Sequence, residues 1–396
     1  MKCQQSSDVL VISMGPYKFA TRPRKAADSY AELVSTRFLS LQGVGRTGKR
    51  DQSGTTKDGV LVIEQIPVRE PRVDLGAMSL AYNALCCYLP ALLKLLALMP
   101  FRPAKVVQVT GAPLAGVAYL HKLVHKSFLV LDINERPASV TATGSVFALA
   151  AKLEPRILRM GARLADLTLT VAPGHAELLQ RNYGFEDVRV VRNCPDAAWR
   201  KPYTAPPMSD SLRIVTVGSI FEGRAFEIMI EAIALLLRDG MQVELDIYGP
   251  GRPQYLSSLE REIEKFGLHN NVRMHGALER NDVAAAYLNA DLGLALYEPG
   301  DPGNDSLSNK VMEVVCAGRP VIAGRLPENV RFMEQFEVGW LTDVSAAALA
   351  ETILEASAAL TPNLAEHCYA VGRSELTWSA AFDSVREDAL RHACRR

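Results

Sequence analysis

The sequence predicts two successive α/β domains, each built on a doubly wound parallel sheet, and three observations support this fold class. Short, nearly continuous apolar runs alternate with longer segments of helical periodicity, which is typical of buried parallel strands joined by crossover helices. The length of 396 residues suits two large domains. Between the two series of runs, residues 193–210 concentrate Pro, Asp and Ser, as a linker does.

Twelve apolar runs predict the strands. In the first domain they are Val9–Ser13, Val60–Ile66, Val106–Thr110, Phe128–Asp132, Leu167–Val171 and Val188–Val191. In the second domain they are Arg213–Val217, Val243–Tyr248, Val272–His275, Leu292–Leu296, Pro320–Ala323 and Trp340–Leu341. The polar stretch Gly43–Asp58 is expected to be a surface loop. We therefore place the first domain at 1–198, the second at 211–374, and a C-terminal segment with a helix over Ala380–Arg395 at 375–396.

Composition excludes several classes of protein. A hydrophobic content of 48% excludes a disordered or fibrous chain, and 44 Lys and Arg against 44 Asp and Glu exclude one that binds nucleic acid along its whole length. Residues 1–200 hold 26 Lys and Arg against 16 Asp and Glu, so an anionic partner is plausible for the first domain. Seven cysteines without a CxxC motif, and no visible secretory signal, lead us to expect a cytoplasmic protein.

Two segments raise the questions of membrane contact and metal binding. Leu75–Met99 is apolar over a length that could cross a bilayer, but Pro90 lies inside it, so two shorter core helices are expected. Together with the basic stretch Lys18–Arg50 it keeps peripheral contact with the cytoplasmic face of a membrane open. His121 and His125 have the spacing of metal ligands, but without a third ligand they predict a solvated helix face.

The segment Asp305–Pro320 is the strongest candidate for chemistry. Its Gly- and Pro-rich approach can expose backbone N–H groups at the start of a helix near Asn309, which favours phosphate binding. Lys310 in the first turn opposes the helix dipole unless an anion is held there. Glu313, one turn further, could accept hydrogen bonds from the vicinal hydroxyls of a sugar. An amphipathic helix with a polar N-terminal face fits the spacing equally well.

A second phosphate-type loop is Val217–Arg224, which follows the first strand of the second domain and leads into a helix over Ala225–Leu237. In doubly wound sheets ligands bind beyond the carboxyl ends of the strands, where this loop would lie. Arg224 at the helix start is again poorly placed unless it faces an anion, although a solvated surface arginine is the simpler alternative.

Four segments of the second domain resemble the donor domain of GT-B glycosyltransferases, specifically retaining family 4 (glycosyl transferases group 1). They are VGSIFEGRAFEIMIEA, LDIYGPG, NVRMHGALERNDVAAAYLNADLGLALYEP and DSLSNKVMEVVCAGRPVIAG. The resemblance implies two Rossmann-like domains facing across a cleft, with the helix of 375–396 crossing back to the first.

The resemblance also assigns roles to residues. It implies that Arg224 and Lys310 grip the donor diphosphate, that Asp305 faces the transferred sugar, and that Glu313 binds the ribose. Ser219 stands where the family usually has an arginine, so one cation is missing. Further substrate contacts are implied for Gly15, Gly218, Gly249, His275, Leu278, Ser308 and Asn309.

In the first domain the segment LVLDINERP resembles the family's strand that ends in an acidic block. Asp132 and Glu135 are its candidate substrate-binding carboxylates, although either could instead fix the loop by capping. Asn134 replaces the family's histidine, so no general base is expected there. Arg22, Arg24 or Lys25 could meet an anionic acceptor.

The activity implied is transfer of a sugar, with retention of configuration, from a UDP- or GDP-linked donor to a hydroxyl of a sugar, lipid-linked or other acceptor. The chain has no DxD motif, so no metal is expected, and no cofactor either, since the nucleotide sugar is a substrate. Two alternatives remain open: a nucleotide-sugar epimerase of the same fold, and a non-catalytic GT-B domain pair that binds a partner. An NAD-dependent enzyme is disfavoured because no GxGxxG follows the first strand.

Overall fold

The chain divides into two compact units. Unit 1 comprises Met1–Val191 and Phe382–Arg396, and unit 2 comprises Arg192–Ala381. The structure, a computed structural model, describes residues 7–14, 20–44, 55–56, 60–69, 86–87, 89–134, 145–195, 202–205, 209–279, 282–298 and 307–394. The expected domains were 1–198, 211–374 and 375–396. The C-terminal helix starts at Trp378, and its residues from Phe382 onward belong to unit 1, so unit 2 extends to Ala381.

Unit 1 is built on a sheet with the strand order β3-β4-β2-β1-β5-β6-β7-β8. All neighbours pair in parallel except β3 and β4, which are antiparallel. The strands are β1 (Ser7–Ser13), β2 (Thr36–Val44), β3 (Thr55–Thr56), β4 (Leu61–Arg69), β5 (Ala104–Thr110), β6 (Phe128–Asp132), β7 (Leu167–Thr170) and β8 (Val188–Val190).

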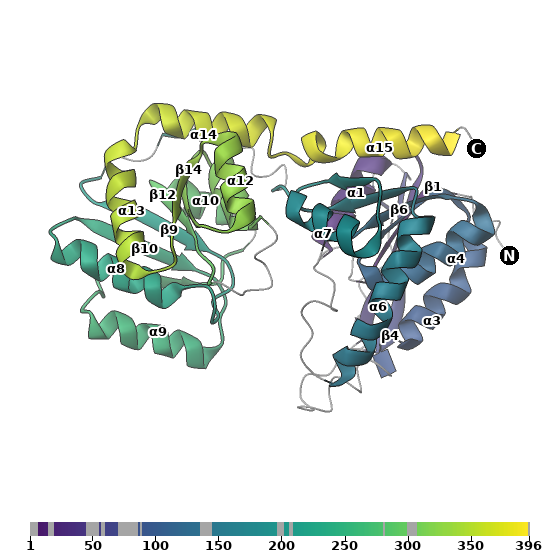
Figure 1. Ribbon diagram of the computed structural model, residues 1–396, viewed down its shortest axis with the longest axis horizontal. Helices are drawn as coiled ribbons and strands as arrows, with labels where there is room; N and C mark the ends of the chain where they lie inside the picture. The colour runs from purple at the N-terminus through teal and green to yellow at the C-terminus, as the bar shows by residue number, and fades with distance from the viewer. Residues whose placement is uncertain are drawn as a thin grey trace. The chain divides into compact units, whose positions relative to one another are not determined.

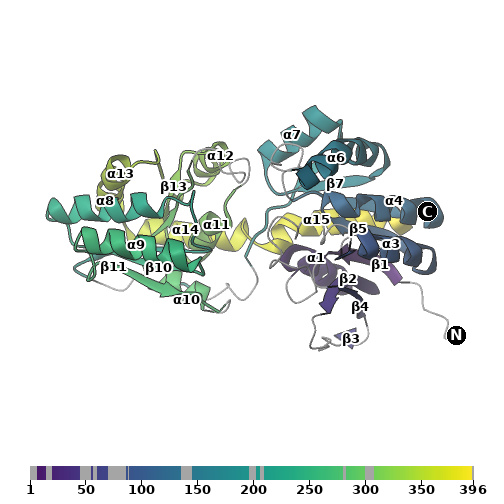
Figure 2. The ribbon, with the colours of Figure 1, turned by 90° about the horizontal axis from the view of Figure 1, so that it is seen from below.

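Helices cover both faces of this sheet (Figures 1 and 2). They are α1 (Thr21–Ala31), α3 (Leu89–Leu98), α4 (Ala115–His125), α6 (Ser145–Leu164), α7 (Pro173–Tyr183) and α15 (Trp378–Cys394), with 3-10 turns η2 (Met99–Phe101) and η3 (Ala112–Leu114). Helices α3, α4, α6 and α7 share one core cluster with Val107 and Val109 of β5. On the opposite face Tyr30 of α1 donates to Gln108 and its ring meets Phe382 of α15, 5.5 Å between centroids.

Two expectations for unit 1 need correction. Strand β2 was not expected, and the predicted loop Gly43–Asp58 contributes to the sheet at both ends: Gly43 and Val44 finish β2, and Thr55–Thr56 form β3. Strand β3 is an edge strand of the sheet, whereas β2 pairs with both β1 and β4. Within Leu75–Met99 the structure describes residues 86, 87 and 89 onward, and Pro90 lies in the first turn of α3, a position that accepts proline. Among the helices described, we find none with the length and apolar character needed to traverse a bilayer.

Unit 2 is built on a sheet whose strands are all parallel, in the order β11-β10-β9-β12-β13-β14. The strands are β9 (Leu212–Val217), β10 (Val243–Tyr248), β11 (Val272–Gly276), β12 (Leu292–Ala295), β13 (Val321–Gly324) and β14 (Gly339–Thr342). Each of the six predicted runs in this domain is a strand. The predicted fold of two doubly wound parallel sheets is thus confirmed.

The helices of unit 2 form two layers. They are α8 (Phe226–Arg238), α9 (Pro253–Lys265), α10 (Val283–Leu288), α11 (Asn309–Cys316), α12 (Pro327–Phe336), α13 (Ala346–Ala359) and α14 (Pro362–Ser374). Helices α8, α9 and α13 share one core cluster, and α10, α11, α12 and α14 share the other. From β9 the chain first builds the sheet outward through β10 and β11, then returns to place β12 on the other side of β9. The loops after β9 and β12 therefore meet at the topological switch point, the usual ligand position in such sheets.

Candidate functional site

A pocket of about 420 Å³ lies at this switch point of unit 2. It is lined by Val217, Gly218, Ser219, Phe221, Arg224, Tyr297, Leu307, Ser308, Asn309, Lys310, Glu313, Leu326 and Asn329. Of the predicted site residues, the structure thus brings together Gly218, Ser219, Arg224 and the Ser308–Glu313 segment. The two loops selected from the sequence as phosphate-type loops form opposite walls of one pocket.

Glycines let the loops after β9 and β10 approach closely. Gly218 has a φ of +142°, and a Cβ there would lie 2.7 Å from Cε of Lys310. A Cβ on Gly249 would lie 1.8 Å from the carbonyl oxygen of Gly218. The backbone N–H of Ile220 donates to the carbonyl of Pro250 at 2.8 Å, which joins the two loops. These positions therefore require glycine. Because Gly218 has no side chain, the side chain of Lys310 can lie flat across it.

Arg224 is held between two aromatic rings. Its guanidinium carbon lies 4.6 Å from the ring centroid of Phe221 and 4.1 Å from that of Tyr297. The next residue, Ala225, caps α8 in the left-handed conformation with φ +55°. Stacking on two rings holds the guanidinium in one orientation and stabilises it by about 0.5–2 kcal/mol per ring.

Lys310 is the second cation of the pocket, and its side chain is almost completely buried. Helix α11 begins at Asn309 as predicted, and Ser308 is its N-cap, with Oγ accepting from the N–H of Lys310 at 3.3 Å. The ammonium donates to Oγ1 of Thr216 at 3.4 Å. Burial, reinforced by the charge of Arg224 and opposed by Glu313, lowers the pKa of Lys310 to about 8.

The carboxylate of Glu313 is the one acidic side chain among the described residues that line the pocket. It lies one helical turn beyond Lys310 and is half-buried. Near it, burial and then the negative charge of Glu313 raise the pKa of Tyr287. Two cations against one carboxylate at a helix N-terminus leave the pocket with an excess of positive charge. An anion is therefore the ligand it favours.

Of the other predicted residues of unit 2, those that the structure describes do not line the pocket. His275 stacks on Tyr248, with 4.3 Å between ring centroids, and its Nε2 lies 2.6 Å from Asp246, which also accepts from Arg273. Although burial opposes the change, these hydrogen bonds lower the pKa of Asp246. Gly249 borders the pocket through Gly218, Leu278 packs against the neighbouring core, and Asp305 falls outside the described residues.

In unit 1 the structure favours a structural role for Asp132. Its carboxylate is buried and accepts from Nε of Arg22 at 2.7 and 3.0 Å, while Arg22 also donates to the carbonyl of Val191 at 2.6 Å. The pair ties α1 to the ends of β6 and β8, so Asp132 and Arg22 neutralise each other. Gly15 and Glu135 fall outside the described residues.

The prediction that His121 lies on a solvated helix face is wrong. The ring is fully buried, with Nδ1 2.8 Å from Oγ of Ser127 and Nε2 2.8 Å from the carbonyl of Arg102. Burial lowers its pKa to about 4. Both ring nitrogens are thus engaged. Across the described part of the chain, no three His, Cys, Asp or Glu side chains are grouped so that they could hold a metal ion.

Sequence reasoning missed Phe221, Tyr297 and Asn329 as pocket residues. The two aromatic residues follow β9 and β12, so their place beyond the carboxyl ends of central strands was a usable signal. Asn329 comes from α12, and its amide is fixed by donating to the carbonyl of Gly324 at 2.8 Å. Nothing in the spacing of the sequence connects it with the two phosphate-type loops.

Comparison with known proteins agrees with this geometry. Residues 211–358 match the family model of Glycosyl transferases group 1. Among solved structures, sucrose-phosphate synthase from Thermosynechococcus elongatus is 14% identical with a TM-score of 0.69, over 98% of this chain and 99% of that one. HepE of Anabaena, in complex with UDP and glucose, is 14% identical with a TM-score of 0.68, over 96% and 98%.

An α,α-trehalose-phosphate synthase (UDP-forming) from Burkholderia vietnamiensis is 12% identical with a TM-score of 0.69, over 98% of each chain. No curated protein matches by sequence. The chain therefore has the GT-B fold of these solved structures, and its residues 211–358 match the glycosyl transferases group 1 family.

Proposed function

We propose that the protein transfers a sugar from a nucleoside-diphosphate sugar to a hydroxyl acceptor, with retention of configuration and without a divalent metal. The observation that carries this proposal is the convergence of Arg224, Lys310 and Glu313 on one pocket at the switch point of the unit 2 sheet. The complex of HepE with UDP and glucose supports uridine as the first nucleotide to test.

Arg224 and Lys310 are assigned to the diphosphate. In the free protein Lys310 is a buried cation beside a second cation, which is unfavourable, and a bound diphosphate relieves both burial and repulsion by supplying the missing negative charge. The same contacts stabilise the nucleoside diphosphate as it leaves, when its charge is highest. Because Ser219 stands where the family usually has an arginine, these two cations and the N-terminus of α11 are assigned to stabilise the departing diphosphate.

Glu313 is assigned to the hydroxyls of the ribose, since its carboxylate can accept two hydrogen bonds from a vicinal diol. Asp305 stays assigned to the transferred sugar by resemblance. In the proposed reaction the acceptor hydroxyl attacks on the face from which the diphosphate departs, and the departing phosphate oxygen takes the proton. No protein base is needed, in keeping with Asn134 and with an Asp132 that is paired inside unit 1.

Nucleotide binding is tested by calorimetric titration of UDP and GDP into the wild-type chain and into Arg224→Met and Glu313→Gln. Loss of a charge-assisted hydrogen bond should weaken binding about 10- to 100-fold in each. Arg238→Met is the matched control, because Arg238 is an exposed arginine of the same unit outside the pocket. Unchanged affinity in both pocket variants would overturn the assignment of the site.

The reaction is tested by incubating the nucleotide sugar that binds best with and without sugar or lipid-linked acceptors. Transfer requires nucleoside diphosphate release and a glycosylated acceptor whose anomeric proton couplings by NMR match those of the donor. An inverted product would contradict retention, and loss of turnover in EDTA would contradict metal independence. An isomerised donor without acceptor would identify an epimerase, and absence of any donor binding would favour the non-catalytic alternative.

A further inference from the structure

Unit 1 exposes large apolar side chains on one layer of helices. They are Leu89 and Leu93 of α3, Phe101 of η2, Leu123 and Val124 of α4, and Leu153 and Met160 of α6. Leu93, Phe101 and Leu123 are 56%, 67% and 70% exposed. We call the exposed side of α3, η2, α4 and α6 the outer face. Single exposed leucines are ordinary, but seven large apolar side chains on three neighbouring helices and the turn η2 require an explanation.

These side chains point away from the sheet. Helices α3, α4 and α6 lie side by side over one face of it (Figure 1), and their opposite sides supply Leu95, Ala118 and Leu158 to the core. Leu89 and Leu93 are one helical turn apart, so they form a stripe along α3 that continues toward Phe101. Among the described residues of unit 1, the apolar side chains of the outer face are thus surplus to core packing.

The same face is strongly basic. Helices α3 and α4 and the turn η2 contain no Asp or Glu, and α6 contains only Glu154. Exposed cations stand between the apolar side chains: Lys94, Lys126, Arg156, Arg159 and Arg163. Unit 1 as a whole holds 28 Lys and Arg against 18 Asp and Glu. Unit 2 is the reverse, and its exposed helix α9 carries three glutamates, Glu260, Glu262 and Glu264.

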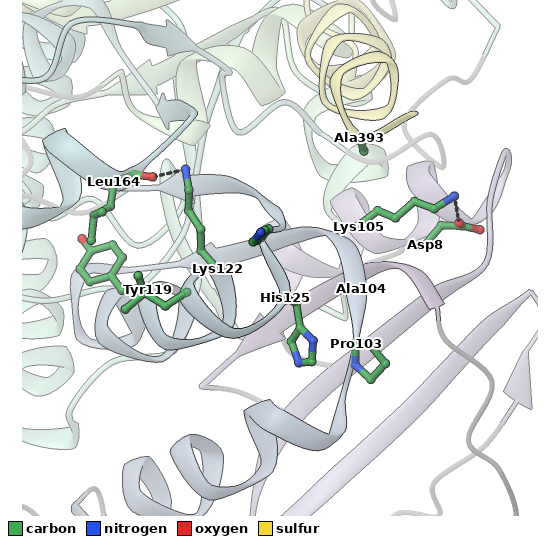
Figure 3. A pocket seen from close by; sticks show the side chains of 11 residues that line it. Asp8, Pro103, Ala104, Lys105, Tyr119, Lys122, His125, Leu164 and Ala393 are labelled. Atoms are coloured by element: carbon green, nitrogen blue, oxygen red, sulfur yellow. Dashed lines mark hydrogen bonds and ion pairs between the residues drawn. The ribbon is translucent and has the colours of Figure 1, made fainter. Parts of the chain in front are cut away.

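A hollow lined by three lysines and by Asp8 borders the outer face. This cavity of about 900 Å³ opens beside Leu123 at the start of β5, and Lys105, Lys122 and Lys126 contribute to its lining. Figure 3 shows Lys122 turned toward the carbonyl of Leu164 and Lys105 paired with Asp8. Lys122 also pairs with Asp166 at 2.6 Å, so the exposed Lys126 is the lysine of this hollow best placed to meet the phosphate layer of a membrane surface.

We propose that the outer face docks on an anionic lipid bilayer. Its leucine, phenylalanine and methionine side chains would enter the boundary between headgroups and acyl chains, while the lysines and arginines around them meet lipid phosphates. A second copy of the chain fits this face less well, because its own lysines and arginines would repel those of the first copy. A protein partner also fits less well, because the centre of a protein interface is usually apolar and poor in charged residues. The inference does not depend on the proposed glycosyl transfer, because it uses only unit 1.

The test is co-sedimentation of the full chain with sucrose-loaded vesicles of equimolar phosphatidylcholine and phosphatidylglycerol, against vesicles of phosphatidylcholine alone. We expect at least about tenfold tighter binding to the anionic vesicles, weakened by 0.5 M NaCl. The double variant Leu93→Ser/Phe101→Ser should bind about tenfold more weakly. The charge reversal Arg156→Glu/Arg159→Glu should bind at least about 30-fold more weakly, since each arginine near the surface contributes about fivefold.

Matched controls lie on unit 2. Leu354 is 57% exposed, so Leu354→Ser removes an equally exposed leucine, and Arg238→Glu reverses an exposed arginine; neither should change sedimentation. All altered side chains are exposed, and circular dichroism checks that each variant folds. Wild-type chain that stays in solution with anionic vesicles, or a charge-reversed variant that still sediments fully, would overturn the proposal. A dimer seen in analytical ultracentrifugation and abolished in Leu93→Ser/Phe101→Ser would also overturn the proposal, because a second copy of the chain would then be the occupant of the outer face.

The outcomes for the two proposals are separable. A chain that binds vesicles but neither UDP nor GDP would refute the proposed donor site and leave the membrane face standing. A chain that binds UDP but no vesicle would do the opposite.

Discussion

Replacing Lys310 by methionine should stabilise the free protein and abolish tight nucleotide binding at the same time. The side chain is almost completely buried, and its neighbours include a second cation, so its charged form is held at a cost. The fall in pKa from 10.5 to about 8 corresponds to about 3 kcal/mol against the charged form at neutral pH. Methionine has a similar length, can occupy the same channel across Gly218 and lacks the charge.

The unfolding temperature of the ligand-free Lys310→Met variant should therefore exceed that of the wild type, by about 2–4 °C for each kcal/mol recovered, with about 3 kcal/mol as the upper limit. The sign with pH follows from the lowered pKa. Between about pH 8 and 10.5 the unfolded chain binds more protons at Lys310 than the folded chain does. The free energy of unfolding of the wild type therefore rises as the pH increases through this range, and the stability advantage of the variant shrinks.

Scanning calorimetry at pH 7 and pH 10, with and without UDP, measures these effects. UDP should raise the melting temperature of the wild type and not that of the variant. Arg319→Met is the contrasting variant. The buried guanidinium of Arg319 donates to the carbonyls of Ala290 and Leu288 at 2.7 and 2.6 Å, so its loss should lower the free energy of unfolding by about 3 kcal/mol. A Lys310→Met variant that melts at or below the wild-type temperature and still binds UDP would refute the reasoning.

Three further predictions concern both units. Gly249→Ala would drive a Cβ into the carbonyl of Gly218, so we expect it to cost about 3 kcal/mol or more, seen as a lower melting temperature of unit 2; a variant as stable as wild type would contradict the close approach. Asp132→Ala would leave Arg22 charged and unpaired in the interior and should cost about 3–5 kcal/mol in denaturant titration, whereas Arg22→Met/Asp132→Leu together should cost far less; equal losses would argue against a coupled pair. UDP affinity should be level up to about pH 8 and then fall toward tenfold per pH unit as Lys310 loses its proton; a profile that is level to pH 9.5 in calorimetry would remove Lys310 from the diphosphate site.

The sheets were largely predictable because buried parallel strands produce an unmistakable sequence pattern. Strands β6 and β10 were predicted with the bounds they have, and α11 begins at the predicted Asn309. Strand β2 was missed since its sequence, TRFLSLQGV, mixes polar and apolar residues and so lacks a continuous apolar run, although β2 pairs with both β1 and β4. The two residues of β3 are too short a run to produce any periodic signal.

Side-chain partners far apart in the chain were less predictable. Asp132 was expected to bind substrate because LVLDINERP resembles the family's acidic block, but its partner Arg22 lies 110 positions earlier and only the fold brings them together. His121 was expected on a solvated helix face because the sequence offers no third metal ligand near His121 and His125, whereas Ser127 and a backbone carbonyl from the turn before β5 enclose it. Arg224 and Lys310 both line the pocket, and the sequence had singled out each of them because a cation at a helix N-terminus opposes the helix dipole unless an anion is bound there.

Helix α15 gives this protein an unusual order of assembly. Phe382, Val385 and Ala389 are buried against unit 1, yet the ribosome reaches them only after it has made all of unit 2. Until then, the nascent first unit lacks the partner of Tyr30, and an apolar groove beside α1 stays open to water. Unit 2, whose residues are continuous in the chain, can complete its core first. The first unit to be translated is therefore the second to be finished, and a fragment ending at residue 191 should need a chaperone or added residues 382–394 to remain soluble.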